Sequence, residues 1–238
     1  MKNLVIIPTF NEIENIPLIL KEIFNLNINL DVLVVDDNSP DKTYQKVEQL
    51  KQKYPNLFLI LNNKKSGIGK AYLKGFDFAI KNNYSKVIQI DADMSHNPYD
   101  IKKLLIKSND YDLVIGSRYI NGIRIINWPL SRLALSYFAN LYAKLITGLS
   151  IYDCTGGFKC FDIKILKSID LKKINSQGYS FQIEMNYRSY VKNFKIKEIP
   201  IIFTDRTIGK SKMSKKIIFE AIFIVPLLRI KKIFNFLK

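Results

Sequence analysis

The sequence predicts an α/β fold in which a mostly parallel, Rossmann-like β-sheet is flanked by helices and followed by an amphipathic helical tail. Short apolar runs alternate with helix-like segments through the first half of the 238-residue chain. This alternation is typical of parallel sheets covered on both faces. Polar and acidic residues gather directly after the apolar runs, and ligands of such sheets bind outside the carboxyl ends of the strands. We therefore expect the functional site at that edge.

Five short apolar runs are expected to form buried strands. They cover residues 4–7, 32–35, 57–61, 87–90 and 113–115. The segments between them have the apolar spacing of helices and cover residues 13–24, 43–53, 70–81 and 99–108. The connections between these segments have ordinary lengths, so strand and helix are expected to follow each other in turn.

The second half of the chain is less regular. Helices are expected over residues 131–147 and 180–192, and strands over residues 157–161 and 195–203. Residues 212–238 form a basic, apolar tail. Neither an internal repeat nor a low-complexity linker divides the chain. We expect one main domain over residues 1–212 and a C-terminal helix over residues 213–238.

The charge balance indicates an anionic partner. The chain has 37 Lys and Arg against 21 Asp and Glu, a formal net charge of +16, which suits nucleic acid, an acidic membrane or phosphorylated substrates. A genome rich in A and T would also favour lysine, so the charge alone does not choose among these partners. A nucleic-acid-binding module is disfavoured, because acidic residues crowd the predicted strand ends.

Few residues are available for cysteine or zinc chemistry. Cys154, Cys160 and His96 are too few for a disulfide framework or a Cys/His zinc site, and a reducing compartment fits this composition. The first apolar run stops at Pro8 without a cleavage-site pattern, so we expect a strand there and not a signal peptide. The sequence has no run of 18 apolar residues, so action at a membrane is expected from one side only.

Asp91-Ala92-Asp93 is the most informative local pattern. Two carboxylates one residue apart repel each other unless a cation or a proton neutralises them. Hard divalent ions such as Mg²⁺ or Mn²⁺ take oxygen ligands and commonly bridge to substrate phosphates. The alternative is a turn at the end of a strand, with Ser95 or Asn97 capping the next helix.

Other polar residues at the strand ends have weaker signals. Asp36 and Asp37 either start a turn or bind a ribose hydroxyl or a base edge. Glu12 is a second candidate at this edge, although an acid early in a helix is also favoured by the helix dipole. The segment Gly67-Ile68-Gly69-Lys70 lacks the spacing of known phosphate loops, and a flexible loop before a helix is the simpler interpretation.

Basic residues in the second half are candidates for holding phosphate, because the planar guanidinium of arginine binds phosphate through two hydrogen bonds. If residues 131–147 are helical, Arg132 and Ser136 share one face. Each arginine taken singly could equally be a solvated surface side chain, and His96 alone is a weak candidate for a general base. The basic candidates are Arg118, Arg132, Arg206, Lys210 and Lys212.

Taken together, these segments resemble family-2 glycosyltransferases and, within that family, the dolichol-phosphate mannosyltransferases. Eight motifs in order carry the resemblance along nearly the whole chain. They are IPTFNE (7–12), DDNSPDKT (36–43), KSGIGKAYLKG (65–75), DADMSHNP (91–98), GSRY (116–119), DCTGGFK (153–159), GYSFQIEM (178–185) and FTDRTIGKSK (203–212). Four positions depart from the pattern usual in the family: Phe10 replaces Tyr, Ser95 replaces Gln, Gly157 replaces Ser and Lys159 replaces Arg.

The resemblance implies a GT-A fold and a role for each matching residue. A nucleotide pocket is implied at Pro8, Phe10, Glu12, Val34 and Asp36. A diphosphate and metal site is implied at Asp91, Ala92 and Asp93, with the metal Mg²⁺ or Mn²⁺. An acceptor-phosphate clamp is implied at Arg118, Arg132 and Ser136, and basic residues that close over the diphosphate at Arg206 and Lys212.

The resemblance further implies an inverting transfer of mannose from GDP-mannose to dolichyl or polyprenyl phosphate. The acceptor is already an anion, so no general base is needed, which agrees with a chain that has one histidine. Another nucleotide sugar on the same lipid class, such as UDP-glucose or an amino sugar, is the alternative. A catalytically silent scaffold is disfavoured, because both carboxylates of the Asp-Ala-Asp pattern are present.

The tail suggests how such a chain would reach a lipid. Residues 217–228 are apolar apart from Glu220, and basic residues flank them on both sides. This pattern suits a helix at the surface of an anionic membrane, although an ordinary core-packing helix is the alternative. We expect a peripheral protein on the cytoplasmic side of a membrane, and a small membrane subunit is a further candidate partner.

Overall fold

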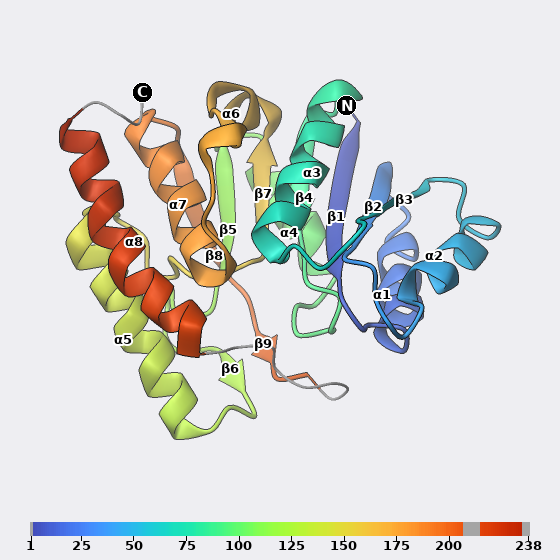
Figure 1. Cartoon of the computed structure of the whole chain (residues 1–238), viewed down its shortest axis with the longest axis horizontal. Helices are drawn as coiled ribbons and strands as arrows, with labels where there is room; N and C mark the ends of the chain where they lie inside the picture. Colours follow the sequence, from blue (N-terminus) through green and yellow to red (C-terminus); the bar gives the residue numbers. More distant parts are fainter. Residues whose placement is uncertain (1, 207–214, 235–238) are drawn as a thin grey trace.

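The computed structural model describes residues 2–206 and 215–234. Its centre is a seven-stranded sheet in the order β3-β2-β1-β4-β7-β5-β8 (Figure 1). These strands are β1 (Asn3–Thr9), β2 (Leu30–Asp36), β3 (Leu57–Leu61), β4 (Lys86–Gln89), β5 (Leu113–Ser117), β7 (Lys159–Asp162) and β8 (Ile196–Pro200). All neighbouring strands are parallel except at β7, which runs antiparallel to both β4 and β5. The prediction of a mostly parallel sheet is therefore confirmed.

Helices cover both faces of this sheet, as the alternating sequence predicts. Along β1, Leu4 and Ile6 enter one apolar core, while Val5 and Ile7 enter the other, because successive side chains of a strand point to opposite faces. The core that contains Val5 is closed by α1 (Asn15–Phe24), α2 (Thr43–Lys51) and α4 (Asp100–Lys107). The core that contains Leu4 is closed by α3 (Ile68–Lys81), α5 (Leu130–Thr147), α6 (Ile163–Ser168), α7 (Gly178–Val191) and α8 (Lys215–Ile233).

Several predicted elements differ from the observed ones in detail. Strand β3 was expected to be buried, but only Leu57 is, because β3 is an edge strand that pairs with β2 alone. The strand predicted over residues 195–203 is divided into β8 and a short β9 (Phe203–Thr204), which pairs with β6 (Ile125–Ile126) in a separate two-stranded sheet. The sequence did not indicate β6, α6 or the short 3₁₀ helix at Leu171–Lys173.

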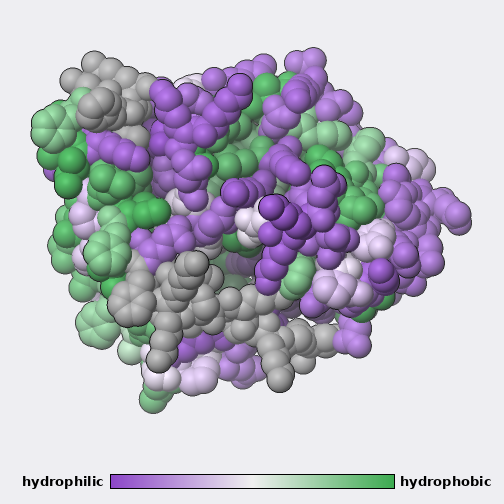
Figure 2. All heavy atoms as spheres, in the orientation of Figure 1, coloured by the Kyte–Doolittle hydropathy of each residue, from purple (hydrophilic) through white to green (hydrophobic). Residues whose placement is uncertain are grey.

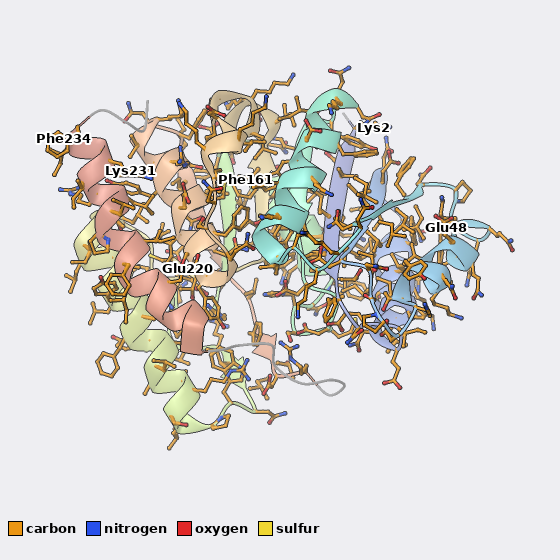
Figure 3. All side chains as sticks on the ribbon, in the orientation of Figure 1. Lys2, Glu48, Phe161, Glu220, Lys231 and Phe234 are labelled. Carbon is orange, nitrogen blue, oxygen red and sulfur yellow. The ribbon has the colours of Figure 1, made fainter. Side chains whose placement is uncertain are left out.

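The C-terminal helix α8 packs against α5 and α7, with Val225 and Leu228 buried in the core. Pro226 lies inside α8 and has no N–H. The carbonyl of Ile222, one turn earlier, instead accepts a hydrogen bond from the hydroxyl of Tyr142 on α5 (2.8 Å). Glu220, labelled in Figure 3, accepts a hydrogen bond from the backbone N–H of Gln177 just before α7 (2.8 Å). Polar contacts therefore fix α8 on its two neighbours.

The predicted tail from Lys212 onward is described only from residue 215, so Lys210 and Lys212 lie outside the described residues. Within residues 2–206 and 215–234, no helix combines the length and the hydropathy needed to span a bilayer.

Candidate functional site

A cavity of about 570 Å³ opens at the carboxyl edge of the large sheet. Strand β1 ends at the lower side of the view in Figure 1, which marks this edge. Residues from the ends of β1, β4 and β5 line it, together with the starts of α3 and α7 and the β9 segment. Most of the residues proposed from the sequence lie on its wall. These are Pro8, Phe10, Glu12, Asp91, Ala92, Asp93, Arg118, Arg132 and Arg206.

Four residues with a proposed role do not line this cavity or cannot be placed. Val34 is fully buried in the core, and Ser136 accepts a hydrogen bond from the hydroxyl of Tyr119 (2.7 Å). Lys212 lies outside the described residues. Asp36 is a fourth case: it is fully buried and accepts hydrogen bonds from the hydroxyls of Thr9 and Ser39 (2.7 Å each). In this structure Asp36 shapes the turn after β2 and does not face the cavity.

The neighbouring Asp37 does line the cavity and organises its wall. Its carboxylate accepts hydrogen bonds from the side chain of Asn62 (2.6 Å) and from the backbone N–H groups of Ser66 (3.0 Å) and Gly67 (2.8 Å). Gly67 has a φ of 91°, a conformation that favours glycine. The loop before α3 is thereby held beside the cavity, and Lys65 of this loop lies 4.0 Å from the ring centroid of Phe10.

The Asp-Ala-Asp pattern forms a tight turn after β4. Asp93 accepts a hydrogen bond from the backbone N–H of Ser95 (3.1 Å), and Met94 between them has a φ of 60°. Burial and the nearby charge of Asp93 raise the pKa of Asp91 to about 7, although Arg206 opposes this shift. The raised pKa shows that the negative charges of Asp91 and Asp93 are not fully neutralised by neighbouring basic groups. A bound cation would neutralise them.

In the structure, Arg206 supplies part of that charge through an ion pair with Asp93 (2.9 Å). No three His, Cys, Asp or Glu side chains within residues 2–206 and 215–234 are grouped as a complete metal site. Asp91 and Asp93 are the residues of this turn that could hold a divalent ion, because Mg²⁺ takes carboxylate oxygens and is commonly bound by one or two carboxylates together with substrate phosphates.

His96 lies next to Asp91 and packs between two aromatic rings. Its ring centroid is 5.1 Å from the rings of both Phe158 and Phe203, and its Nδ1 is 3.8 Å from Asp91. Burial lowers the pKa of His96 to about 4. The imidazole is therefore neutral near pH 7.

Arg118 is bound chiefly by protein groups. Its Nε and Nη2 each donate to the carboxylate of Asp153 (2.7 Å), and Nη2 also donates to Thr155 (2.8 Å). Asp153 is fully buried. Burial alone would raise the pKa of this carboxyl, but the charge of Arg118 outweighs that effect and lowers it. Of the guanidinium nitrogens, Nη1 is the one that Asp153 and Thr155 do not engage.

Arg132 lies at the start of α5 and also lines the cavity. Its Nη1 donates to both carboxylate oxygens of Asp205 (2.9 and 3.0 Å), and its guanidinium lies 4.1 Å from the ring of Trp128. Asp205 and Arg206 are adjacent, so one short segment after β9 binds both Arg132 and Asp93.

Sequence reasoning missed several residues of this wall. Lys65, Trp128, Gln177, Gln182 and Asp205 all line the cavity or bind residues that do. Asp37, named above as a candidate without an assigned role, also lines it. Gln182 lies inside GYSFQIEM, one of the motifs that carry the resemblance, and that motif was the available signal. The partners Asp153 and Asp205 are far from Arg118 and Arg132 in the sequence, so spacing gave no indication of them.

Comparisons with known proteins agree with this geometry. Residues 4–170 match the sequence profile of the family described as Glycosyl transferase family 2. Polyprenol monophosphomannose synthase from Mycolicibacterium smegmatis is 42% identical over 224 residues, 93% of this chain and 84% of the relative. Undecaprenyl-phosphate mannosyltransferase from Micrococcus luteus is 40% identical over 222 residues, 93% of this chain and 91% of the relative. Dolichol-phosphate mannosyltransferase from Pyrococcus furiosus is 35% identical over 226 residues, 92% of this chain and 61% of the relative.

Solved structures share the fold at lower identity. Glucosyl-3-phosphoglycerate synthase from Mycobacterium tuberculosis, in complex with Mn²⁺, UDP and glucosyl-3-phosphoglycerate, has a TM-score of 0.67 and 15% identity over 96% of this chain and 79% of that chain. TarS from S. aureus in complex with UDP has a TM-score of 0.62 and 20% identity over 96% of this chain and 65% of that chain. These structures establish the GT-A-like fold.

Proposed function

The chain belongs to glycosyltransferase family 2, and on this premise we propose that it transfers mannose from GDP-mannose to dolichyl or another polyprenyl phosphate, with inversion at the anomeric carbon. The observation that carries the proposal is the similarity to two relatives at 40–42% identity over 93% of the chain, each named for mannose and a polyprenyl phosphate or polyprenol. The geometry of the cavity supports it.

The order of residues along the sheet edge matches the order of groups in such a reaction. Pro8 near the end of β1 and Phe10 just after it offer an apolar wall and a ring for a nucleoside, with Asp37 beside them after β2. Asp91 and Asp93 follow β4, and Arg118 follows β5 further along the edge. A nucleoside, its diphosphate and an acceptor phosphate would therefore lie side by side across the strands.

The charges of the cavity support transfer without a general base. A lipid phosphate is already an anion, and the neutral His96 is not required to remove a proton from it. A divalent ion held by Asp91 and Asp93 would neutralise charge on the departing diphosphate. Arg206 is placed to move from Asp93 to that diphosphate, and Arg132 to hold the acceptor phosphate against the anomeric carbon, which is catalysis by positioning and electrostatics.

The exposed face of α5 and α8 supports a membrane location. Leu130, Phe138 and Leu145 of α5 are 82%, 63% and 72% exposed, and Phe223 of α8 is 73% exposed. Apolar residues gather along this side of the molecule, at the left of Figure 2. Such a face suits the lipid interface. We place the protein at the cytoplasmic surface of a membrane, where lipid phosphate and nucleotide sugar meet.

A donor panel tests the proposed function. Purified protein is incubated with polyprenyl phosphate, Mg²⁺ or Mn²⁺, and radiolabelled GDP-mannose, GDP-glucose, UDP-glucose or a UDP-amino sugar. We expect label from GDP-mannose in the organic phase, in a mild-acid-labile product, with chelator abolishing the transfer. Label from another sugar alone would overturn the assignment of mannose, and no lipid-phase label from any donor would overturn lipid-phosphate transfer.

A further inference from the structure

The side-chain oxygen of one buried amide in the cavity lacks a hydrogen-bond partner within the described parts of the chain. Gln182 on α7 is 4% exposed and lines the cavity, and its Oε1 makes no hydrogen bond to any described residue. Buried side-chain amides nearly always have partners, because an unsatisfied one loses its hydration without compensation. A group from a bound ligand is the natural partner for an amide that faces a cavity.

Gly157 creates a small space between this amide and the Asp-Ala-Asp turn. A Cβ atom at Gly157 would lie 3.6 Å from Nε2 of Gln182 and 3.6 Å from Oδ2 of Asp91. Both are ordinary van der Waals distances, so the space accepts at least one additional heavy atom. The amide of Gln182 and the carboxylate of Asp91 therefore both border this space.

The backbone around Gln182 is held firmly. Its carbonyl accepts a hydrogen bond from Nζ of the fully buried Lys159 (3.1 Å). The preceding residue, Phe181, stacks on Tyr72 of α3 with the ring centroids 5.9 Å apart. A backbone held in this way gives the Gln182 side chain a fixed starting point beside the cavity, so no backbone rearrangement is needed when a ligand arrives.

The position of this space along the sheet edge identifies its ligand group. Gly157 lies just before β7, and β7 lies between β4 and β5. The space is therefore flanked by the Asp91 and Asp93 turn on one side and by Arg118 on the other. In the proposed function, the first position takes the donor diphosphate and the second the acceptor phosphate. The group between a donor diphosphate and an acceptor phosphate is the sugar.

We propose that Gln182 binds hydroxyl groups of the donor sugar in the space left by Gly157. This inference rests on the proposed function for the position of the donor. An amide offers one acceptor and two N–H donors, and each sugar hydroxyl both donates and accepts, so one amide can pair with two adjacent hydroxyls of a pyranose. Gln182 thus binds the sugar of the donor and not its nucleotide.

The test compares each nucleotide sugar with its own nucleoside diphosphate. Binding of GDP-mannose against GDP, and of UDP-glucose against UDP, is measured by calorimetry with Mn²⁺ on wild type, Gln182→Met and the control Gln45→Met, which changes an exposed glutamine on α2. Methionine keeps the length of the side chain but removes its hydrogen bonds. We expect Gln182→Met to lose about 10- to 100-fold in affinity for the nucleotide sugar that wild type binds, with affinity for the nucleoside diphosphate unchanged.

Analogues of the bound donor that lack single sugar hydroxyls locate the contact. The analogue without the contacted hydroxyl should bind wild type and Gln182→Met equally. An equal loss for nucleotide sugar and nucleoside diphosphate, no loss for either, or a wild type that binds no nucleotide sugar would each overturn the proposal. These measurements need no lipid, so failure of lipid-phosphate transfer would not be mistaken for failure of the sugar site.

Discussion

Among single residues, the carboxylates of the site are distinguished by their partners. Asp36 and Asp37 are adjacent, yet Asp36 binds inward to Thr9 and Ser39, whereas Asp37 binds the loop before α3 and lines the cavity. Successive residues at a strand end point to opposite sides, so one of the two had to turn away. The sequence predicted a pair of acids at this edge, and the resemblance implied Asp36 for the nucleotide pocket, whereas in the structure Asp37 lines the cavity.

Asp93 should be essential to turnover and unimportant to folding. Asp93→Asn removes one of the two negative charges available for a divalent ion and the partner of Arg206. We expect turnover to fall by on the order of 10² to 10³, with Mn²⁺ binding by calorimetry lost and the thermal unfolding midpoint nearly unchanged. Asp110→Asn, at an exposed acid, is the matched control. Full activity of Asp93→Asn in excess chelator would contradict a metal role for this turn.

Lys159 should make the stability of the protein depend on pH above neutrality. Burial lowers the pKa of Lys159 from 10.5 to about 7, against the opposing charge of Asp153. Between these values the unfolded chain binds more protons than the folded one, so the free energy of unfolding rises with pH across this window. Below about pH 7 the folded protein must bury the charged ammonium, and this contribution is at its least favourable.

The measurement is urea unfolding of wild type and Lys159→Met at pH 6, 7, 8 and 9. The difference in the free energy of unfolding, wild type minus variant, should increase with pH above 7, since methionine has no proton to release. Groups that titrate in both proteins, such as the buried cysteines, cancel in this difference. Parallel pH curves for the two proteins would show that Lys159 keeps its charge when folded.

At the scale of helices and strands, periodicity predicted the regular elements well and the junctions poorly. The five strands and four helices of the first half lie within two residues of the predicted bounds, because long apolar patterns set them. The division of residues 195–203 into β8 and β9 depends on pairing of β9 with β6, seventy-odd residues earlier. Single-sequence patterns carry no information on such distant pairing.

The segment after β9 and the start of α5 should act together on the acceptor side. Arg132→Ala removes a guanidinium that binds Asp205 and lies over Trp128. We expect the KM for polyprenyl phosphate to rise about 10- to 100-fold, since hydrogen bonds to charged groups are worth roughly 1.5–3 kcal/mol. Affinity for the nucleotide donor, measured by calorimetry, should stay near that of wild type.

Asp205→Asn serves as the matched variant for this prediction. It weakens the ion pair but leaves Arg132 in place, so the KM for the lipid phosphate should change little or fall. An equal rise in KM for both variants would assign Arg132 to holding the β9 segment. A loss of donor affinity equal to the loss of acceptor affinity would move Arg132 to the nucleotide side of the cavity.

In the whole molecule, the sheet order determines which motifs meet. The insertion of antiparallel β7 between β4 and β5 brings Gly157 beside Asp91, although 66 residues separate them in the sequence. The rule for parallel sheets predicted the edge at which the site forms. It could not predict the contribution of β7, because an antiparallel strand presents its start, and not its end, at that edge.

The apolar face of α5 and α8 should bind membranes without crossing them. The apolar stretch 217–228 would be about 18 Å long as a helix, against a hydrocarbon core of about 30 Å. Basic residues flank it, including Lys231 near the outer end of α8 (Figure 3), and each one near an anionic surface is worth on the order of 1 kcal/mol. We expect flotation with anionic liposomes at low salt, little with neutral liposomes, and release as salt screens these charges.

Two sets of substitutions test whether membrane binding depends on the face of α5 and α8 or on exposed apolar side chains in general. The triple variant Leu130→Ser, Phe138→Ser and Phe223→Ser removes exposed apolar side chains from α5 and α8, and should float less at every salt concentration. Ile106→Ser removes a side chain of similar exposure (65%) from α4, which covers the opposite face of the sheet, and should float like wild type. Flotation that survives high salt and ignores lipid charge would indicate deep insertion or a hydrophobic partner subunit. Flotation by neither wild type nor variants would mean that the lipid acceptor reaches the cavity without this face, so that α8 serves only to pack against α5 and α7.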